Sequence, residues 1–333
     1  MATATGMGSW PGTDVRKALG IVRDLLAEPG DAVDGLPYLP ELPDRGPGAD
    51  LVGRGLGILV DLPVDLQPSG WRLTDRPGRD LSQTTAYLRQ DLDELAEAFD
   101  GWTGRLKLQV AGPWTLAAST WLPRGERVVS DSGATRDLVD SLAEGVRLHV
   151  TAVQRLLPGA SLVLQLDEPS LPAVIDGRLP TASGYGLVRA VDPQDTLDGL
   201  ETVLGAAPEG TRPVVHCCAP DAPIVLLRRT GADLAVDTAL LGPRGWEGVA
   251  VGVEEGMTLY AGSVPTDGTL TRPLAVADRL VERWRDLGMP SSELANLVIT
   301  PACGLAGLTP GRARDVSRVC IESARELAER ATA

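Results

Sequence analysis

The stretch Val214-Val215-His216-Cys217-Cys218-Ala219-Pro220 carries the strongest single indication of how this chain folds. It begins with apolar, β-branched residues and has a proline on either side, which is typical of one buried strand. Side chains alternate between the two faces of a strand, so His216 and Cys218 share one face and Cys217 occupies the other. An imidazole and a thiolate on one face would supply half of a tetrahedral zinc site. A buried strand that holds no metal is the equally weighted alternative.

Few other side chains could complete such a site, because the sequence contains two histidines and four cysteines. Cys303 follows a second apolar run, 297–300, where the chain enters a loop marked by proline and glycine. Asp237 ends a third apolar run, 232–237. Taken alone, Cys303 is more typical of a small core residue, and Asp237 of a helix cap or a loop acid. The predicted metal ligands are His216, Cys218, Asp237 and Cys303, whereas Cys217 and Cys320 are expected to pack in the core.

Apolar runs of strand length alternate with amphipathic helical segments along most of the chain. The predicted strands span residues 3–9, 36–41, 105–110, 161–166, 214–218, 232–237, 258–262 and 297–300. The predicted helices span residues 13–28, 49–62, 81–99, 137–157, 195–204, 274–287 and 310–331. Residues 63–79 are rich in proline and glycine and are expected to form a long functional loop.

This alternation favours a parallel sheet closed into a (β/α)8 TIM barrel, an α/β fold, with residues 1–333 as a single catalytic domain. A doubly wound open sheet with an appended domain is the alternative. Polar residues decide between the two, because they cluster at predicted strand ends: Ser9, Glu41, Asp167, His216, Cys218, Asp237 and Cys303. A barrel brings these ends to one mouth, where active sites of this fold form, whereas an open sheet would spread them apart.

Length and composition exclude several classes of protein. The chain has 333 residues, of which 43% are hydrophobic, enough for a sizeable core. The formal net charge of −14, without a cluster of lysine and arginine, argues against nucleic acid or an anionic membrane as a partner. We find neither a signal-peptide pattern nor an apolar run approaching the roughly 20 residues that cross a bilayer. The cysteines do not form a disulfide framework, so a cytoplasmic location is expected.

Two acidic segments are further candidates for the site. Asp167-Glu168-Pro169 ends a predicted strand, so one carboxylate could face the barrel mouth while the other caps a helix. Glu41 lies in a proline-rich segment, where an acidic side chain is usually solvated. Neither segment identifies a function by itself.

Five stretches, in this order, resemble motifs of the catalytic C-terminal half of cobalamin-independent methionine synthase. They are Thr5-Gly6-Met7-Gly8-Ser9-Trp10-Pro11, Ala111-Gly112-Pro113-Trp114-Thr115-Leu116, Gln165-Leu166-Asp167-Glu168-Pro169, His216-Cys217-Cys218 and Pro301-Ala302-Cys303-Gly304-Leu305. The family's motifs read approximately T-x-I-G-S-[FY]-P, T-G-P-x-T-[IL], Q-I-D-E-P, H-x-C and N-P-D-C-G-L. The resemblance covers nearly the whole chain. It implies a (β/α)8 barrel of the superfamily that also includes uroporphyrinogen decarboxylase and corrinoid-dependent methyltransferases.

The resemblance also implies roles for individual residues. His216, Cys218 and Cys303 would ligate zinc, and Asp237 falls where the family carries a glutamate ligand. The amino-acid backbone of homocysteine would be held by Met7, Gly8 and Ser9, and its ammonium group by Glu41 and Asp167. The tryptophan that stacks on folate would be Trp114 or Trp121.

The sequence departs from the family at two points. Residues 261–265 contain no histidine, although the family places a proton-handling histidine near there. The chain also lacks the N-terminal half of the long enzymes, so it resembles the short, single-barrel form.

The leading hypothesis is a zinc-dependent S-methyltransferase that makes methionine from homocysteine, with Asp167 as the predicted catalytic residue. The methyl donor would be methyltetrahydrofolate or a methyl-corrinoid, in the latter case with a corrinoid protein as a partner. The alternatives are a methyltransferase that acts on another thiol, and a non-catalytic zinc-binding barrel of the same superfamily.

Overall fold

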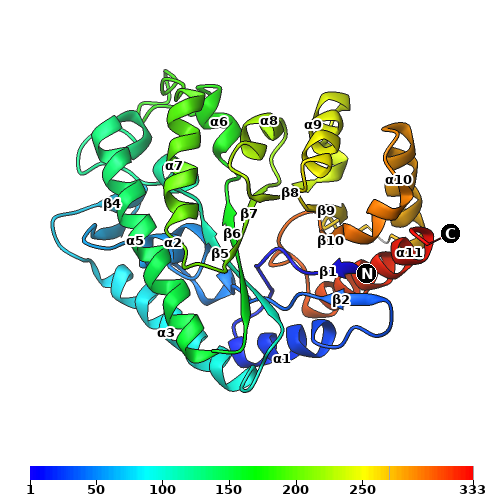
Figure 1. Cartoon of the computed structure of the whole chain (residues 1–333). Helices are drawn as coiled ribbons and strands as arrows, with labels where there is room; N and C mark the ends of the chain where they lie inside the picture. Colours follow the sequence, from blue (N-terminus) through cyan, green and yellow to red (C-terminus); the bar gives the residue numbers. More distant parts are fainter. Residues whose placement is uncertain (270, 333) are drawn as a thin grey trace.

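The computed structural model describes residues 1–269 and 271–332 and shows a (β/α)8 barrel with its helices arranged around the strands (Figure 1). The strands pair in parallel in the order β2-β1-β10-β9-β8-β7-β6-β5. Their bounds are β1 Ala2–Ala4, β2 Val33–Gly35, β5 Arg105–Ala111, β6 Ser161–Asp167, β7 Arg212–Cys217, β8 Asp233–Asp237, β9 Leu259–Val264 and β10 Val298–Pro301. The predicted TIM barrel is therefore confirmed.

The barrel closes where the segment that follows β2 meets β5. Tyr38 forms an isolated parallel bridge with Lys107. The Lys107 N–H donates to the Pro37 carbonyl at 2.8 Å, and the Lys107 carbonyl accepts from the Leu39 N–H at 3.0 Å. These bonds complete the ring between the two ends of the strand order.

The first two predicted strands were placed too far along the chain. Strands were expected at 3–9 and 36–41, but the regular ladders cover only Ala2–Ala4 and Val33–Gly35. Pro37 and Pro40 lack the N–H that a continuous ladder requires. Gly8, at φ +135°, takes the first segment out of strand geometry. Both segments nevertheless stay extended beside each other, with Ser9 and Glu41 bridged in parallel.

The helices cover the outside of the strands. Their bounds are α1 Val15–Leu26, α2 Leu51–Gly57, α3 Arg79–Ala98, α4 Pro113–Ser119, α5 Ser132–Leu156, α6 Leu171–Ile175, α7 Pro193–Gly205, α8 Ile224–Arg228, α9 Pro243–Glu254, α10 Pro273–Asp286 and α11 Pro310–Arg330. Short 3-10 helices span Pro43–Arg45, Val128–Ser130, Thr238–Leu240 and Ser291–Asn296. Asp14 caps α1 by accepting a hydrogen bond from the Lys17 N–H.

Helix α9 was not predicted, because its glycines obscure the helical pattern. Gly248 sits where a Cβ atom would lie 3.0 Å from Ile224 of α8. The glycine therefore permits a close approach between α8 and α9 at the expense of helix propensity.

The expected loop at 63–79 is instead largely a β-hairpin. Strands β3 (Val64–Gln67) and β4 (Gly70–Leu73) pair antiparallel, and Leu73 donates its N–H to the Trp121 carbonyl. Trp71 and Leu73 lie two residues apart on β4, so they share one face of the hairpin, and both are buried. Burial of these two side chains gives the segment a regular structure in spite of its prolines and glycines.

The apolar core has two parts. One lies between strands and helices, and the other fills the inside of the barrel with Met7, Leu36, Val163, Val214, Ala235, Tyr260 and Val298. Each fully buried side chain of the Leu or Val type contributes about 1.5–3 kcal/mol to stability. Among residues 1–269 and 271–332, no helix combines the length and the apolarity that crossing a membrane requires.

Candidate metal centre

The register of the sheet places His216 beside Asp167. His216 pairs with Asp167 of β6 on one side and with Ala235 of β8 on the other. Because Ala235 belongs to the apolar cluster inside the barrel, His216 and Asp167 also face the interior. Both residues lie at the carboxyl ends of their strands, which is where active sites of this fold form.

The hydrogen bonds of Asp167 determine which nitrogen of His216 carries the proton. Asp167 Oδ1 lies 2.6 Å from His216 Nδ1 and accepts a hydrogen bond from Gln165 Nε2 at 2.7 Å. A carboxylate has no proton to give, so His216 Nδ1 is the donor. His216 Nε2 is buried and has no hydrogen-bond partner among the described residues. Its lone pair is therefore available to a metal ion, and a carboxylate behind a ligating imidazole is a common arrangement in metal sites.

Two thiols lie together at the barrel mouth. Cys218, one residue beyond β7, and Cys303, two residues beyond β10, have their sulfur atoms 3.1 Å apart, and both side chains are partly exposed. The hydrogen bond from Cys218 lowers the pKa of Cys303 to about 6, with a further contribution from nearby His216. The same hydrogen bond raises the pKa of Cys218. One thiolate therefore forms readily, and thiolate is the form that binds metal.

Asp237 ends β8 with its carboxylate turned toward its own backbone. Oδ1 accepts a hydrogen bond from the Ala239 N–H at 2.9 Å and so caps the 3-10 helix Thr238–Leu240. Partial burial raises the pKa of Asp237, whereas the capping hydrogen bonds and the nearby His216 act to lower it. The helix-cap interpretation of Asp237 is thus confirmed, and a role as a metal ligand would be additional.

The donor atoms at this end of the barrel suit zinc. An unpartnered imidazole nitrogen and two sulfur atoms are ligands that zinc prefers. Within residues 1–269 and 271–332, however, no three His, Cys, Asp or Glu side chains are already arranged to hold a metal ion. The residues fit zinc by their chemistry and by the free Nε2 of His216.

The residues predicted to hold the amino-acid substrate lie close to Asp167. The Met7 carbonyl accepts a hydrogen bond from Gln165 Nε2 at 2.8 Å, so the first segment reaches the Asp167 side of the mouth. Ser9 contacts the loop after Cys303, where the Ser9 carbonyl accepts from the Leu305 N–H at 3.1 Å. At Gly8 a Cβ atom would lie 2.7 Å from the Gln109 side chain, so only glycine fits this position without displacing Gln109.

Glu41 is buried and charge-paired, contrary to the expectation of a solvated acid. Its side chain lies 3.3 Å from Arg54 Nε, and Arg54 also pairs with Asp91. Burial raises the pKa of Glu41 to about 7, and the Arg54 charge opposes that rise. The Asp167 charge raises it further. The structure thus brings together Met7, Gly8, Ser9, Glu41, Asp167 and His216.

The two tryptophan candidates lie outside the barrel interior. Trp114 of α4 is buried against α7, where its Nε1 donates to the Thr196 carbonyl at 2.8 Å. It borders a cleft of about 730 Å³ between α5 and α7. Trp121 follows α4 and stacks under Arg127, whose guanidinium carbon lies 4.5 Å from the ring centre. Both tryptophan rings thus already make contacts within the protein.

Glu168, the neighbour of Asp167, caps α4. Its carboxylate accepts hydrogen bonds from the backbone N–H groups of Trp114 and Thr115 at 2.9 and 2.7 Å. Burial raises the pKa of Glu168 to about 7 in spite of these bonds. The expectation that one of the two adjacent acids caps a helix is confirmed.

Sequence reasoning missed one residue of this centre, Lys107. Lys107 is fully buried inside the barrel, and its Nζ donates to Gln165 Oε1 at 2.6 Å. Its ammonium lies 5.4 Å from the centre of the Tyr38 ring. Burial lowers the pKa of Lys107 to about 8, and the Asp167 and Glu41 charges oppose this shift. A lysine at an alternating position of a strand buried on both faces was the available signal.

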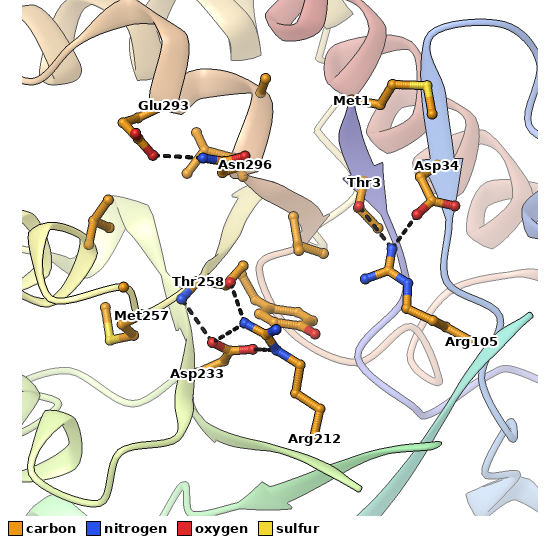
Figure 2. A pocket seen from close by; sticks show the side chains of 16 residues that line it. Met1, Thr3, Asp34, Arg105, Arg212, Asp233, Met257, Thr258, Glu293 and Asn296 are labelled. Carbon is orange, nitrogen blue, oxygen red and sulfur yellow. Dashed lines mark hydrogen bonds and ion pairs between the residues drawn. The ribbon is translucent and has the colours of Figure 1, made fainter. Parts of the chain in front are cut away.

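A separate hollow of about 330 Å³ lies at the opposite, amino-terminal end of the strands (Figure 2). Its arginines already have partners: Arg105 contacts Asp34 and Thr3, and Arg212 contacts Asp233. Figure 2 shows Arg105 directed at Thr3 and Asp34, and Arg212 directed at Asp233 and Thr258. We interpret this end as the ion-paired base of the barrel, because active sites of this fold lie at the other end.

Comparison with known proteins gives structural matches alone. No family model and no curated protein matches the sequence. Among solved structures, the chain is similar to a protein from Listeria monocytogenes classed provisionally as a vitamin-B12-independent methionine synthase. Its TM-score is 0.58 at 13% identity, over 98% of each chain. The chain is also similar to a B12-independent methionine synthase from Shewanella sp. W3-18-1 in complex with selenomethionine. That TM-score is 0.51 at 13% identity, over 78% of this chain and 70% of the other. The chain therefore shares its fold with B12-independent methionine synthase structures.

Proposed function

We propose that this protein is a zinc-dependent methyltransferase that methylates the sulfur of homocysteine to give methionine. The observation that carries the proposal is the free Nε2 of His216 at the same strand ends as the Cys218–Cys303 thiol pair. The shared fold supports it, since one protein of this fold is described with selenomethionine, an analogue of the proposed product.

His216, Cys218 and Cys303 would hold the metal, with Asp237 as a fourth, weaker ligand. When bound, zinc would keep the acceptor sulfur as a thiolate at neutral pH and orient it toward the methyl donor. A carboxylate that already caps a helix is the ligand most easily replaced by an incoming sulfur. Asp237 therefore suits the position that the substrate would take.

The substrate's amino-acid end would lie between Ser9, Glu41 and Asp167. Asp167 uses Oδ1 for both of its hydrogen bonds, to His216 and to Gln165. Oδ2 would accept from the substrate ammonium, and the buried Glu41 carboxylate would add a second negative charge nearby. The methyl group would pass from the donor to sulfur in one displacement, and Asp167 would act by holding and aligning the acceptor.

The donor would be methyltetrahydrofolate or a methyl-corrinoid, the latter delivered by a corrinoid protein. The cleft beside Trp114 is large enough for part of a folate, but Trp114 itself is occupied in packing against α7. Trp121 is likewise occupied by Arg127. These contacts leave both donors in the proposal.

The alternatives are a barrel that binds zinc without catalysis and a methyltransferase that acts on a thiol other than homocysteine. Two sequence features favour the first of these, namely the lack of a histidine at 261–265 and Asp237 in place of the family's glutamate. The carboxylates Glu41 and Asp167 favour homocysteine, because both suit an ammonium group.

The test combines metal analysis with a methyl-transfer assay. The zinc-loaded protein is offered homocysteine with each donor in turn, and methionine is measured. Cys303→Ala should lose the bound zinc and the activity, whereas Cys320→Ala, which changes a buried cysteine of α11, should keep both. Unchanged zinc content in Cys303→Ala would remove that ligand, and zinc binding without methionine formation from either donor would favour one of the alternatives.

A further inference from the structure

A continuous line of hydrogen bonds joins Lys107 to His216 across the inside of the barrel. Lys107 Nζ donates to Gln165 Oε1 at 2.6 Å, and Gln165 Nε2 donates to Asp167 Oδ1 at 2.7 Å. Asp167 Oδ1 then accepts from His216 Nδ1 at 2.6 Å. The four side chains come from three adjacent strands, β5, β6 and β7, and all are buried.

The direction of every bond in this line follows from the Lys107 ammonium at one end and the Asp167 carboxylate near the other. An ammonium donates and cannot accept, so charged Lys107 must meet the oxygen of the Gln165 amide. The amide NH₂ group is thereby turned toward Asp167 and toward the Met7 carbonyl, 2.8 Å away. A reversed amide would put nitrogen against nitrogen at Lys107 and oxygen against oxygen at Asp167. Lys107 therefore favours, together with the two acceptors Met7 and Asp167, the one orientation of Gln165 in which Asp167 is held by a donor.

The fixed Asp167 in turn selects the tautomer of His216. With Oδ1 held in place beside Nδ1, the proton of the neutral imidazole resides on Nδ1, and Nε2 carries the lone pair. This nitrogen is the one without a partner among the described residues.

The burial of Lys107 costs free energy, because its ammonium is removed from water. It is fully buried beside the Tyr38 ring, and the charges that face it are Asp167 of β6 and Glu41 of the segment after β2. If Lys107 served only to neutralise the charges of those two carboxylates, a positive charge would suffice and no particular hydrogen-bond direction would be needed. The contact of Lys107 with Gln165, rather than with either carboxylate, is what distinguishes a positioning role.

We propose that Lys107 is a positioning residue that acts through Gln165 and Asp167 to keep Nε2 of His216 unprotonated and directed at the metal position. Its role toward zinc rests on the proposed function. Its effect on the His216 tautomer does not.

The first experiment reads the tautomer in the metal-free protein. The chain has two histidines, His149 and His216, so ¹⁵N imidazole spectra of labelled protein contain two residues to assign. In the wild type, His216 should show a protonated Nδ1 and an unprotonated Nε2. Lys107→Met should produce a mixture of the two tautomers. Gln165→Leu interrupts the same line of hydrogen bonds one residue nearer to His216, so it should also produce a mixture of tautomers. It replaces Lys107→Met in this experiment if that variant does not fold.

The matched control is Gln109→Met. Gln109 is the next inward residue of β5, is also buried, and hydrogen-bonds the Leu39 carbonyl instead of the line to His216. It should lower stability and leave the tautomer unchanged. A wild-type His216 pattern in folded Lys107→Met or Gln165→Leu would overturn the proposal, and so would an equal change in Gln109→Met.

The second experiment measures zinc affinity by competition with a chelator. Lys107→Met should weaken binding by about 10- to 100-fold, the usual effect of removing support behind a ligating histidine. In a Gln165→Leu background the same substitution should cause no further loss, because its effect passes through Gln165. Additive losses would show a direct charge effect and overturn the proposal. A protein that meets both expectations without forming methionine would contradict the proposed function alone.

Discussion

His216 Nδ1 lies 2.6 Å from Asp167 Oδ1, and this contact gives one carboxylate two roles. The motif resemblance implies that Asp167 holds the substrate ammonium, whereas in the structure it contacts a candidate metal ligand. Both roles are compatible, because the contacts to His216 and Gln165 use the same oxygen. Substrate binding and metal binding should therefore depend on Asp167 together.

Asp167→Asn tests this coupling. The amide cannot accept from Gln165 and His216 and also receive an ammonium as a carboxylate does, so zinc affinity should fall by about 10- to 100-fold. The KM for homocysteine should rise in the zinc-saturated variant. Chelator competition and steady-state kinetics measure the two effects. The control is Glu168→Gln, which alters the α4 cap and should lower the melting temperature with unchanged zinc affinity. A wild-type KM in saturated Asp167→Asn would exclude the substrate role.

Asp237→Asn distinguishes a labile ligand from a simple helix cap. Asparagine keeps the Oδ1 that accepts from the Ala239 N–H, so the local fold should be retained. If Asp237 ligates zinc, Asp237→Asn should bind zinc more weakly than the wild type but more tightly than Cys303→Ala. Zinc affinities of the three proteins decide the matter. An affinity equal to that of the wild type would remove Asp237 from the ligand set.

Lys107 should make stability increase with pH above neutrality. Its pKa is about 8 in the folded protein, against 10.5 for an unburied lysine. Between these values the unfolded chain binds more protons at this residue, so the free energy of unfolding rises with pH. The full difference corresponds to about 3 kcal/mol. Urea unfolding between about pH 7 and pH 10 should show wild-type stability rising relative to Lys107→Met. The exposed Lys17→Met serves as the control, and a constant difference for Lys107→Met would contradict this prediction.

Asp91 should be among the most destabilising positions to change. It is fully buried on α3, accepts two hydrogen bonds from Arg45 at 2.7 and 2.8 Å, and also accepts from Arg54. Asp91→Ala leaves two buried guanidinium groups without that partner and should cost about 3–5 kcal/mol of unfolding free energy. Glu144→Ala, which removes an exposed partner of Arg147 on α5, should change stability little. Urea unfolding compares the two variants, and similar losses would show that the buried network contributes no more than a surface pair.

The sequence predicted most of the barrel because its strands are long and apolar. Strands β5 to β10 were located within one or two residues, since an apolar run or an alternating apolar pattern marks each of them. The pattern failed where geometry is set by contacts far apart in the chain. The extended segment 36–41 pairs with β5 through backbone groups of Pro37, Leu39 and Lys107, which no local pattern reveals. The hairpin at 64–73 likewise depends on contacts distant in the sequence, such as that between Leu73 and Trp121. The prolines and glycines of this segment predict a loop instead.

The candidate site was predicted by residue type but not by arrangement. His216, Cys218 and Cys303 were recognised because imidazole and thiol groups are scarce in this sequence. Asp167 points into the barrel and Glu168 caps α4. The order of these two adjacent acids in the sequence does not reveal which of them takes which place. Lys107 escaped notice because a lysine in an alternating strand ordinarily indicates a solvated face. Its burial follows only from the closure of the barrel around it.

That closure divides the mouth of the barrel into two parts with different backbone bonding. β5 and β6 are paired at seven residues, whereas β5 meets the segment after β2 through an isolated bridge. His216 lies in β7, and Cys218 and Cys303 follow β7 and β10, so all three are attached to the continuous ladder. Ser9 and Glu41 lie beyond the ends of β1 and β2 and pair with each other through a second isolated bridge. The proposed metal ligands therefore rest on regular strand pairing, whereas the proposed contacts to the amino-acid substrate rest on single bridges.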